Sequence, residues 1–219
     1  MSISEITVES LIRTLAARFE AADLVYGHGT GSSIDEAAYL VFAHLGLAHE
    51  DAASAYRATV SPDAVTTLES LAARRVGDRI PVAYLVNEAW FCGLPFYVDQ
   101  RVLIPRSPIG ELIEREFSPW AGESTLQRVA DLGTGSGCIA IAIALAMPAT
   151  TVDAIDVDQG ALEVAHINVE RHGVADRVRV LMSDFFSNLS ASDDGPYDLI
   201  VSNPPYVDDT DMSALPAEF

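Results

Sequence analysis

The tetrapeptide Asn203-Pro204-Pro205-Tyr206 has residue types in an order that could bind a flat NH2 group. Two consecutive prolines fix their φ angles and lack amide hydrogens, which leaves nearby carbonyl groups to act as acceptors. The side-chain oxygen of Asn203 and the carbonyl of Pro204 then form two convergent acceptors for the two hydrogens of the NH2 group. Tyr206 can lie against the plane of that group and tolerate a nearby cation. The alternative interpretation is a rigid Pro-Pro turn without a ligand.

Such a corner suits the methylation of a poor nucleophile. An amide nitrogen is nearly non-basic, so its reaction with a methyl donor depends on how well the two are held in line. Acceptors that bind the NH2 group more strongly as it gains positive charge stabilise the transition state preferentially. This chemistry requires no general base.

A glycine-rich loop, Gly133-Thr134-Gly135-Ser136-Gly137, lies between an expected strand at residues 127–131 and an expected helix at residues 137–147. Glycine lets the backbone turn sharply and approach a ligand without a Cβ atom in the way. Asp156 ends the next expected strand, where a carboxylate can accept the hydroxyl groups of a ribose. The GxGxG spacing, with Asp131 at the loop entry, suits a nucleoside cofactor without a pyrophosphate. S-adenosylmethionine is the candidate, and a plain strand–helix turn is the alternative.

Two further acidic residues belong to the same expected sheet. Asp184 follows the strand at residues 178–182 and could accept a hydrogen of an adenine amino group, with Phe185 packed on the ring. The alternative for Asp184 is a helix-capping role beside core aromatic residues. Asp153 lies within the strand at residues 151–156 and is predicted to be solvated.

The composition limits the partners. All 13 basic residues are arginine, against 32 acidic residues, and the net charge is −19. The lack of lysine excludes Schiff-base chemistry, and the acidity opposes DNA as a partner and favours a basic protein or a small molecule. Cys92 and Cys138 show no metal-binding spacing, and two free thiols indicate a reducing cytoplasm. The longest apolar run, residues 138–147, is too short to span a membrane.

Hydrophobic periodicity predicts two parts of different structure. Helices are expected at residues 8–24, at 33–47 with Ser33 as its cap, and from Ser61 to about Gly77. Residues 89–98 are typical of a β-hairpin with a Gly93-Leu94-Pro95 turn, and a helix is expected at residues 107–117. Strands at 127–131, 151–156, 178–182 and 197–201 then alternate with helices at 137–147 and 161–172. This alternation predicts an α/β fold with a parallel, doubly wound sheet.

These motifs together resemble class I S-adenosylmethionine-dependent methyltransferases that modify planar NH2 groups. Residues 79–85, 91–93 and 102–106 resemble the protein-glutamine N5-methyltransferase family. Release-factor enzymes of that family usually continue Pro-Arg-Pro-x-Thr-Glu, whereas this chain reads Pro105-Arg106-Ser107-Pro108. That variant is similar to the branch that methylates a glutamine of large-subunit ribosomal protein L-three.

The resemblance implies a helical substrate-recognition domain at residues 1–88, a β-hairpin linker at 89–106 and a methyltransferase domain with a Rossmann-like sheet at 107–219. It implies that Asn203 and Pro204 hold the glutamine amide, with Tyr206 at the catalytic corner. Pro205, Arg106 and Phe91 would line or border the substrate site. The cofactor would contact the loop, strand-end and corner residues, namely Asp131, Gly133, Thr134, Gly135, Gly137, Asp156, Asp184, Phe185 and Asn203.

The family's sheet continues beyond the strands predicted here, so we expect this sequence to lack C-terminal strands and to leave a sheet edge uncovered. Two other functions stay open. The chain could be a nucleic-acid amino-methyltransferase that acts on the NH2 group of adenine or guanine, although its acidity opposes that. It could also be a truncated, non-catalytic module that binds the cofactor or the ribosome.

Overall fold

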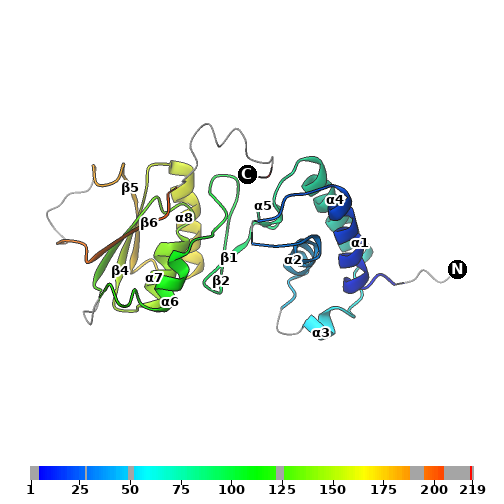
Figure 1. Ribbon diagram of the computed structural model, residues 1–219, viewed down its shortest axis with the longest axis horizontal. Coiled ribbons are helices and arrows are strands. Elements are labelled where there is room, and N and C mark those ends of the chain that lie inside the picture. Colours follow the sequence, from blue (N-terminus) through cyan, green and yellow to red (C-terminus); the bar gives the residue numbers. More distant parts are fainter. Residues whose placement is uncertain are drawn as a thin grey trace. The chain divides into compact units, whose positions relative to one another are not determined.

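The chain forms two compact units in the computed structural model, Met1–Asn87 with Asp208–Phe219, and Glu88–Val207. The structure describes residues 5–27, 29–48, 52–121, 126–187, 195–204 and 218. The first unit is helical, and the second contains both sheets (Figure 1).

Among its described residues, the helical unit contains three helices of more than three turns and two short ones. They are α1 (Val8–Ala21), α2 (Ser33–Leu45), α3 (Ala52–Ala55), α4 (Pro62–Gly77) and α5 (Val82–Val86). Apolar residues at helical spacing face a shared core that includes Leu15, Phe19, Leu40 and Leu68. The predicted cap of α2 is wrong by one residue, because the Oγ atom of Ser32, rather than that of Ser33, accepts the backbone N–H of Asp35.

A buried ion pair also lies in this unit. The guanidinium of Arg75 is fully buried, and its Nε atom is 3.2 Å from Oε1 of Glu36. Arg75 also donates from Nη2 to the carbonyl of Val25 at 3.0 Å. Burial raises the pKa of the Glu36 carboxyl, although Arg75 opposes that effect. The stability of this core therefore depends on keeping both charges together.

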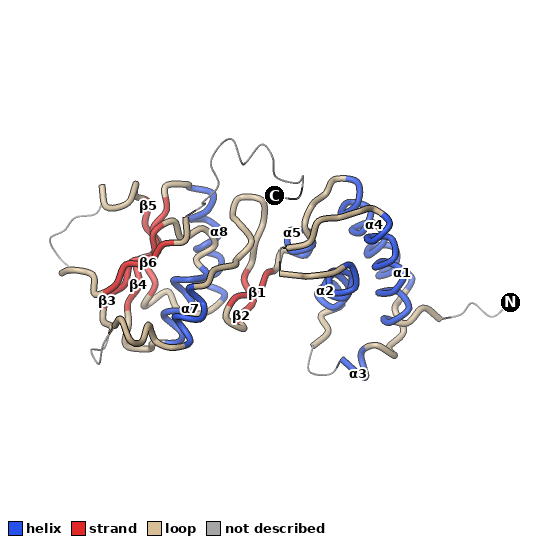
Figure 2. The backbone as a smooth tube through the Cα atoms, in the orientation of Figure 1, coloured by secondary structure: helices blue, strands red, loops and turns tan. Residues whose placement is uncertain are grey.

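The main sheet of the second unit is parallel, as predicted, with the order β5-β4-β3-β6. Its strands are β3 (Arg128–Leu132), β4 (Thr151–Asp156), β5 (Val178–Met182) and β6 (Leu199–Ser202). The described helices of this unit, α6 (Ile109–Glu114), α7 (Cys138–Ala146) and α8 (Gln159–Arg171), lie on one side of the sheet (Figures 1 and 2). The predicted α/β class is confirmed, and α6 is shorter than the predicted helix at residues 107–117.

Asp153 is buried on the other face of this sheet, so the prediction that it is solvated is wrong. Its two carboxylate oxygens accept hydrogen bonds from Arg179 at 2.7 and 2.9 Å, from Arg128 at 2.9 Å and from the hydroxyl of Tyr197 at 2.7 Å. Arg179 stands directly opposite Asp153 in the parallel register of β4 and β5. The neighbouring strands therefore supply the charges that allow this carboxylate to be buried.

A two-stranded hairpin precedes the sheet and belongs to the same unit. Its strands, β1 (Ala89–Phe91) and β2 (Leu94–Phe96), are antiparallel. The turn consists of Cys92 and Gly93, both with positive φ. The predicted turn at Gly93-Leu94-Pro95 therefore begins one residue too late, and its last two residues belong to β2. Phe91, expected at the border of the substrate site, is instead buried in the hydrophobic core of this unit.

Candidate functional site

The order of the strands brings two loops together. Strands β3, β4 and β5 follow one another in the sheet, but β6 returns to the other side of β3. Ligands of open parallel sheets collect outside the carboxyl ends of the strands, where the direction of winding reverses. In this sheet that place lies between β3, which leads into the glycine loop, and β6, which leads into Asn203.

The glycine loop needs glycine at three positions for two different reasons. Gly133, Gly135 and Gly137 have φ angles of 70°, 55° and 79°, a region that other residues rarely adopt. A Cβ atom on Gly133 or Gly135 would meet no atom within 4 Å, whereas one on Gly137 would lie 3.3 Å from Cβ of Ala165. The first two glycines thus leave open space for a ligand, and the third permits close packing on α8.

Asp131 lies at the end of β3 with its carboxylate fully buried beneath the loop. Its Oδ2 atom accepts the hydroxyl of Thr134 at 2.6 Å and the backbone N–H of Ala140 at 3.2 Å. Its Oδ1 atom is buried and has no hydrogen-bond partner within the described parts of the chain. Burial raises the pKa of Asp131 to about 6. The charge of this carboxylate would attract a cationic group bound outside the loop.

Asp156 at the end of β4 connects this loop to the start of α8. Its Oδ2 atom accepts the N–H of Gly135 at 2.9 Å, and its Oδ1 atom accepts the N–H groups of Val157 and Asp158 at 2.8 and 3.0 Å. Each carboxylate oxygen can accept more than one hydrogen bond, so ribose hydroxyl groups remain possible partners. Val157, which the sequence analysis did not single out, exposes 69% of its surface beside this acid.

Asp184 and Phe185 follow β5, the strand next to β4. Met182 pairs with Asp156 in the register of these strands, so both residues lie just beyond the end of the sheet at Asp156. Asp184 is exposed. Phe185 is 65% exposed, and its backbone φ is 50°. An exposed aromatic residue in left-handed backbone is unusual, which makes this position a candidate for ligand contact.

Asn203 and Pro204 follow β6 and lie next to the glycine loop. Ser202 pairs with Leu132 and donates its hydroxyl to the carbonyl of that residue at 2.8 Å, so Asn203 comes level with Gly133. The Nδ2 atom of the half-buried Asn203 donates to the carbonyl of Arg106 at 3.3 Å. Pro204 is exposed, while Pro205 and Tyr206 lie outside the described residues.

The structure therefore brings the described residues predicted for the cofactor to the same edge of the sheet as Asn203 and Pro204. In the described ranges, no group of three or more His, Cys, Asp or Glu residues is arranged to hold a metal ion. No described helix has both the length and the apolar character needed to cross a membrane.

The family described as "Methyltransferase small domain" matches residues 120–218. A relative from Bordetella pertussis, named ribosomal protein uL3 glutamine methyltransferase, is 44% identical over 97% of this chain and 71% of its own length. A relative of the same name from Bradyrhizobium diazoefficiens is 45% identical over 97% of this chain and 68% of its own. A solved structure described as "delta-N METTL16 MTase domain" is 24% identical with a TM-score of 0.44, over 67% of this chain and 60% of that one.

The parallel sheet, the glycine loop after β3 and the acid after β4 define the second unit as a Rossmann-like methyltransferase domain. The two curated relatives match almost the whole chain, including both of its units. The chain belongs to the ribosomal protein uL3 glutamine methyltransferase family, which confirms the branch expected from the sequence.

Proposed function

We propose that this chain transfers a methyl group from S-adenosylmethionine to the side-chain amide nitrogen of a glutamine in ribosomal protein uL3. The observation that carries this proposal is the position of Asn203 beside the glycine loop, at the ends of two neighbouring parallel strands. The names of the two relatives, at 44% and 45% identity, support the same substrate. The net charge of −19 supports a basic protein partner over a nucleic acid.

The cofactor assignment is supported by the donors and acceptors that surround the loop. The buried carboxylate of Asp131 would attract the ammonium group of the methionine portion electrostatically, and the open sides of Gly133 and Gly135 give that portion room. Thr134, through its hydrogen bond to Asp131, and Gly137, through its packing on α8, hold the loop in shape. When bound, S-adenosylmethionine supplies an electrophilic methyl group on a sulfonium.

Strand-end residues would bind the rest of the cofactor. Asp156 suits the ribose hydroxyl groups, since its carboxylate lies at the edge of β4 beside the loop. Asp184 suits the adenine amino group, and the exposed ring of Phe185 suits the adenine face. Val157 adds an exposed apolar side chain next to Asp156 for the other face of the base.

The acceptor would be held by Asn203 and Pro204. The Nδ2 atom of Asn203 donates to the carbonyl of Arg106, and the Oδ1 atom is the other terminal atom of the same side-chain amide. That oxygen and the carbonyl of Pro204 are assigned to the two hydrogens of the glutamine NH2 group, with Pro205 and Tyr206 completing the corner. These acceptors favour the more positive nitrogen of the transition state and orient it. After transfer the methylated nitrogen would release its extra proton to solvent, so that no general base is needed.

We assign substrate choice to the helical unit, in line with the recognition domain expected at residues 1–88. This unit has a hydrophobic core of its own, distinct from the core of the sheet unit. A partner in the ribosome would place the reaction in the cytoplasm. The β-hairpin is assigned to connect recognition with catalysis.

The proposal is tested by incubating the chain with uL3 and isotopically labelled S-adenosylmethionine, and by locating the label with mass spectrometry. We expect the label on a glutamine side chain. Asn203→Ala should abolish transfer and leave cofactor affinity unchanged, whereas Thr151→Ala, which removes an exposed hydroxyl at the opposite end of the sheet, should retain transfer. Equal loss of transfer and cofactor affinity in Asn203→Ala would make Asn203 structural.

Two other results would favour the alternatives. Methylation of RNA or DNA but not of uL3 would identify a nucleic-acid amino-methyltransferase. Cofactor binding, measured by calorimetry, without transfer to any of these acceptors would identify a binding module.

A further inference from the structure

The segment of residues 97–106 connects the cofactor side of the sheet unit to Asn203. It begins directly after β2 and runs along α8, the helix that follows the ribose-side acid Asp156. It ends at Arg106, whose carbonyl accepts the side-chain amide of Asn203. The segment contains no helix or strand, so side-chain contacts must determine its position.

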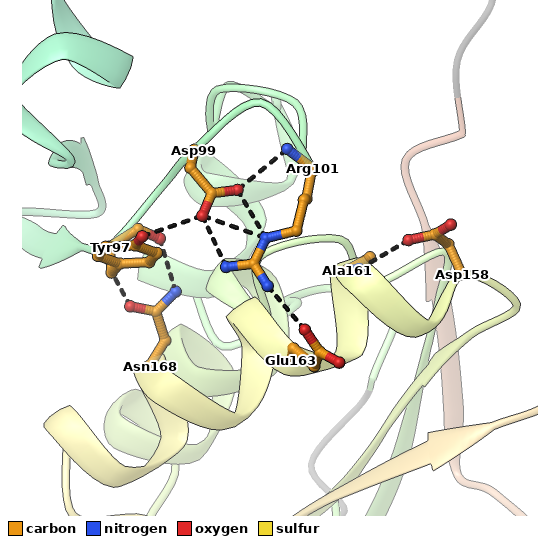
Figure 3. A network of polar contacts seen from close by, with 7 residues as sticks. All are labelled: Tyr97, Asp99, Arg101, Asp158, Ala161, Glu163 and Asn168. Carbon is orange, nitrogen blue, oxygen red and sulfur yellow. Dashed lines mark hydrogen bonds and ion pairs between the residues drawn. The ribbon is translucent and has the colours of Figure 1, made fainter.

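The first contact is made by Asn168 in the middle of α8. This side chain is fully buried, and its Oδ1 atom accepts the N–H of Tyr97 at 2.7 Å. Its Nδ2 atom donates to the carbonyl of Tyr97 and to that of Ser136 in the glycine loop, both at 2.9 Å. One amide therefore joins the 97–106 segment, α8 and the cofactor loop, as Figure 3 shows for the Tyr97 bonds.

The second contact is made by Arg101, which packs against the first turn of α8. Its guanidinium lies between the carboxylates of Asp99 and Glu163 (Figure 3). Nη2 is 2.6 Å from Oδ2 of Asp99, and Nη1 is 2.8 Å from Oε2 of Glu163. Asp99 also accepts the backbone N–H of Arg101 at 3.0 Å and the hydroxyl of Tyr97 at 2.9 Å. The hydrogen bonds from Arg101 lower the pKa of Asp99 to about 2, so the pair stays charged.

The stem of Arg101 lies over Gly160 in the first turn of α8. A Cβ atom on Gly160 would lie 3.2 Å from Cδ and 3.4 Å from Cγ of Arg101. The absence of a side chain there lets the arginine cross the helix and reach Glu163. Beyond Arg101, the buried residues Val102, Ile104 and Pro105 fix the rest of the segment up to Arg106.

We propose that Arg101 and Asn168 are positioning residues, which hold the 97–106 segment so that the carbonyl of Arg106 orients the side-chain amide of Asn203 toward the acceptor. The hydrogen bond from Nδ2 selects which of the two amide atoms faces the substrate. If the carbonyl of Arg106 were displaced, the side-chain amide of Asn203 could rotate. Its NH2 group would then face the NH2 group of the glutamine, and two donors cannot form a hydrogen bond with each other. This inference rests on the proposed function for its effect on catalysis, but not for its effect on Asn203.

The test replaces Arg101 by Met, which keeps a stem over Gly160 and removes the guanidinium. The matched control is Arg179→Met, because Arg179 also makes a partly exposed two-bond pair with a carboxylate in the same unit, away from the segment. Both variants are made in the full 219-residue chain. The direct readout is the pair of side-chain NH2 signals of Asn203 in the NMR spectrum, assigned by their loss in Asn203→Ala.

We expect Arg101→Met to shift the Asn203 signals and to lower kcat on uL3 by between about tenfold and about 100-fold, since a misplacement of about 1 Å can cost about 100-fold. Its Kd for S-adenosylmethionine and its KM for uL3 should stay within about twofold of the wild type, because both binding surfaces remain. Arg101→Lys, which can keep one ion pair, should restore part of kcat. Arg179→Met should leave kcat and the Asn203 signals unchanged.

Unmoved Asn203 signals in Arg101→Met, or equal shifts in both variants, would overturn the inference. A shift confined to Arg101→Met with an unchanged kcat would overturn its catalytic part. A specific shift in a protein whose wild type fails to methylate uL3 would instead refute the proposed function and leave the orienting contact in place.

Discussion

Replacing Asp131 with Asn tests whether the ionisation of this buried carboxyl makes the affinity for S-adenosylmethionine depend on pH. The Oδ1 atom of Asp131 is buried without a partner, and burial raises its pKa to about 6. A neutral carboxyl cannot pair with the ammonium of S-adenosylmethionine as well as a carboxylate can. Affinity should therefore increase as the pH rises through this pKa.

The magnitude follows from the ionised fraction. With a pKa of about 6, the carboxyl is about 90% ionised at pH 7 and about 10% ionised at pH 5. If only the ionised form binds, the Kd for S-adenosylmethionine should rise about tenfold from pH 7 to pH 5, which corresponds to about 1.4 kcal/mol. Stability should change in the opposite sense, because the folded chain holds a proton that the unfolded chain loses above pH 4. The free energy of unfolding without cofactor should thus decrease as the pH rises from about 4 to about 6.

The assay is calorimetric titration with S-adenosylmethionine at pH 5, 6, 7 and 8. Asp131→Asn should bind weakly with a flat profile, since it has no titrating carboxyl. Asp153→Asn is the matched control: burial raises the pKa of Asp153, but hydrogen bonds from Arg179, Tyr197 and Arg128 outweigh this and leave it below the usual value. This control should keep the wild-type slope. A flat wild-type profile, or the same slope in Asp131→Asn, would refute the role of Asp131.

Three other substitutions test the framework of the site and of the helical unit. Gly137→Ala should lower the free energy of unfolding by about 1–3 kcal/mol in denaturant titrations, because its φ is positive and the new methyl would crowd Ala165. Arg75→Met should lower it by about 3–5 kcal/mol by leaving Glu36 buried without its partner, and a second change, Glu36→Gln, should recover part of that loss. Asp156→Ala should weaken cofactor binding by about 1–3 kcal/mol in calorimetry, and an unchanged affinity would remove it from the site.

The sequence predicted the parallel sheet well because its signals are local. Strands β4 and β5 were predicted at the residues where they occur, since each carries apolar residues at alternate positions. The glycine loop and Asp156 were predicted from the same local order of strand, loop and helix. The spacing of motifs along the chain could not show that β6 lies beside β3, and the shared site depends on that neighbourhood.

Contacts between distant segments account for what the sequence analysis missed. Asp153 was predicted to be solvated because its arginine partners come from β3 and β5, which are separate in the sequence. The role of Asn168 depends on hydrogen bonds to residues far away along the chain, and a lone asparagine in a helix gives no signal of them. The short helices α3 and α5 were missed because segments of this length show no clear periodicity.

The hydrogen bonds of the Asp156 carboxylate bear on whether the backbone of the site would change shape when the cofactor leaves. This carboxylate accepts hydrogen bonds from the backbone N–H of Gly135 in the glycine loop and from those of Val157 and Asp158 before α8. The loop is therefore preorganised, and the empty and loaded forms of the cofactor pocket should share one backbone shape. Under the proposed function, exchange of spent cofactor for fresh cofactor would require no refolding of the loop between turnovers.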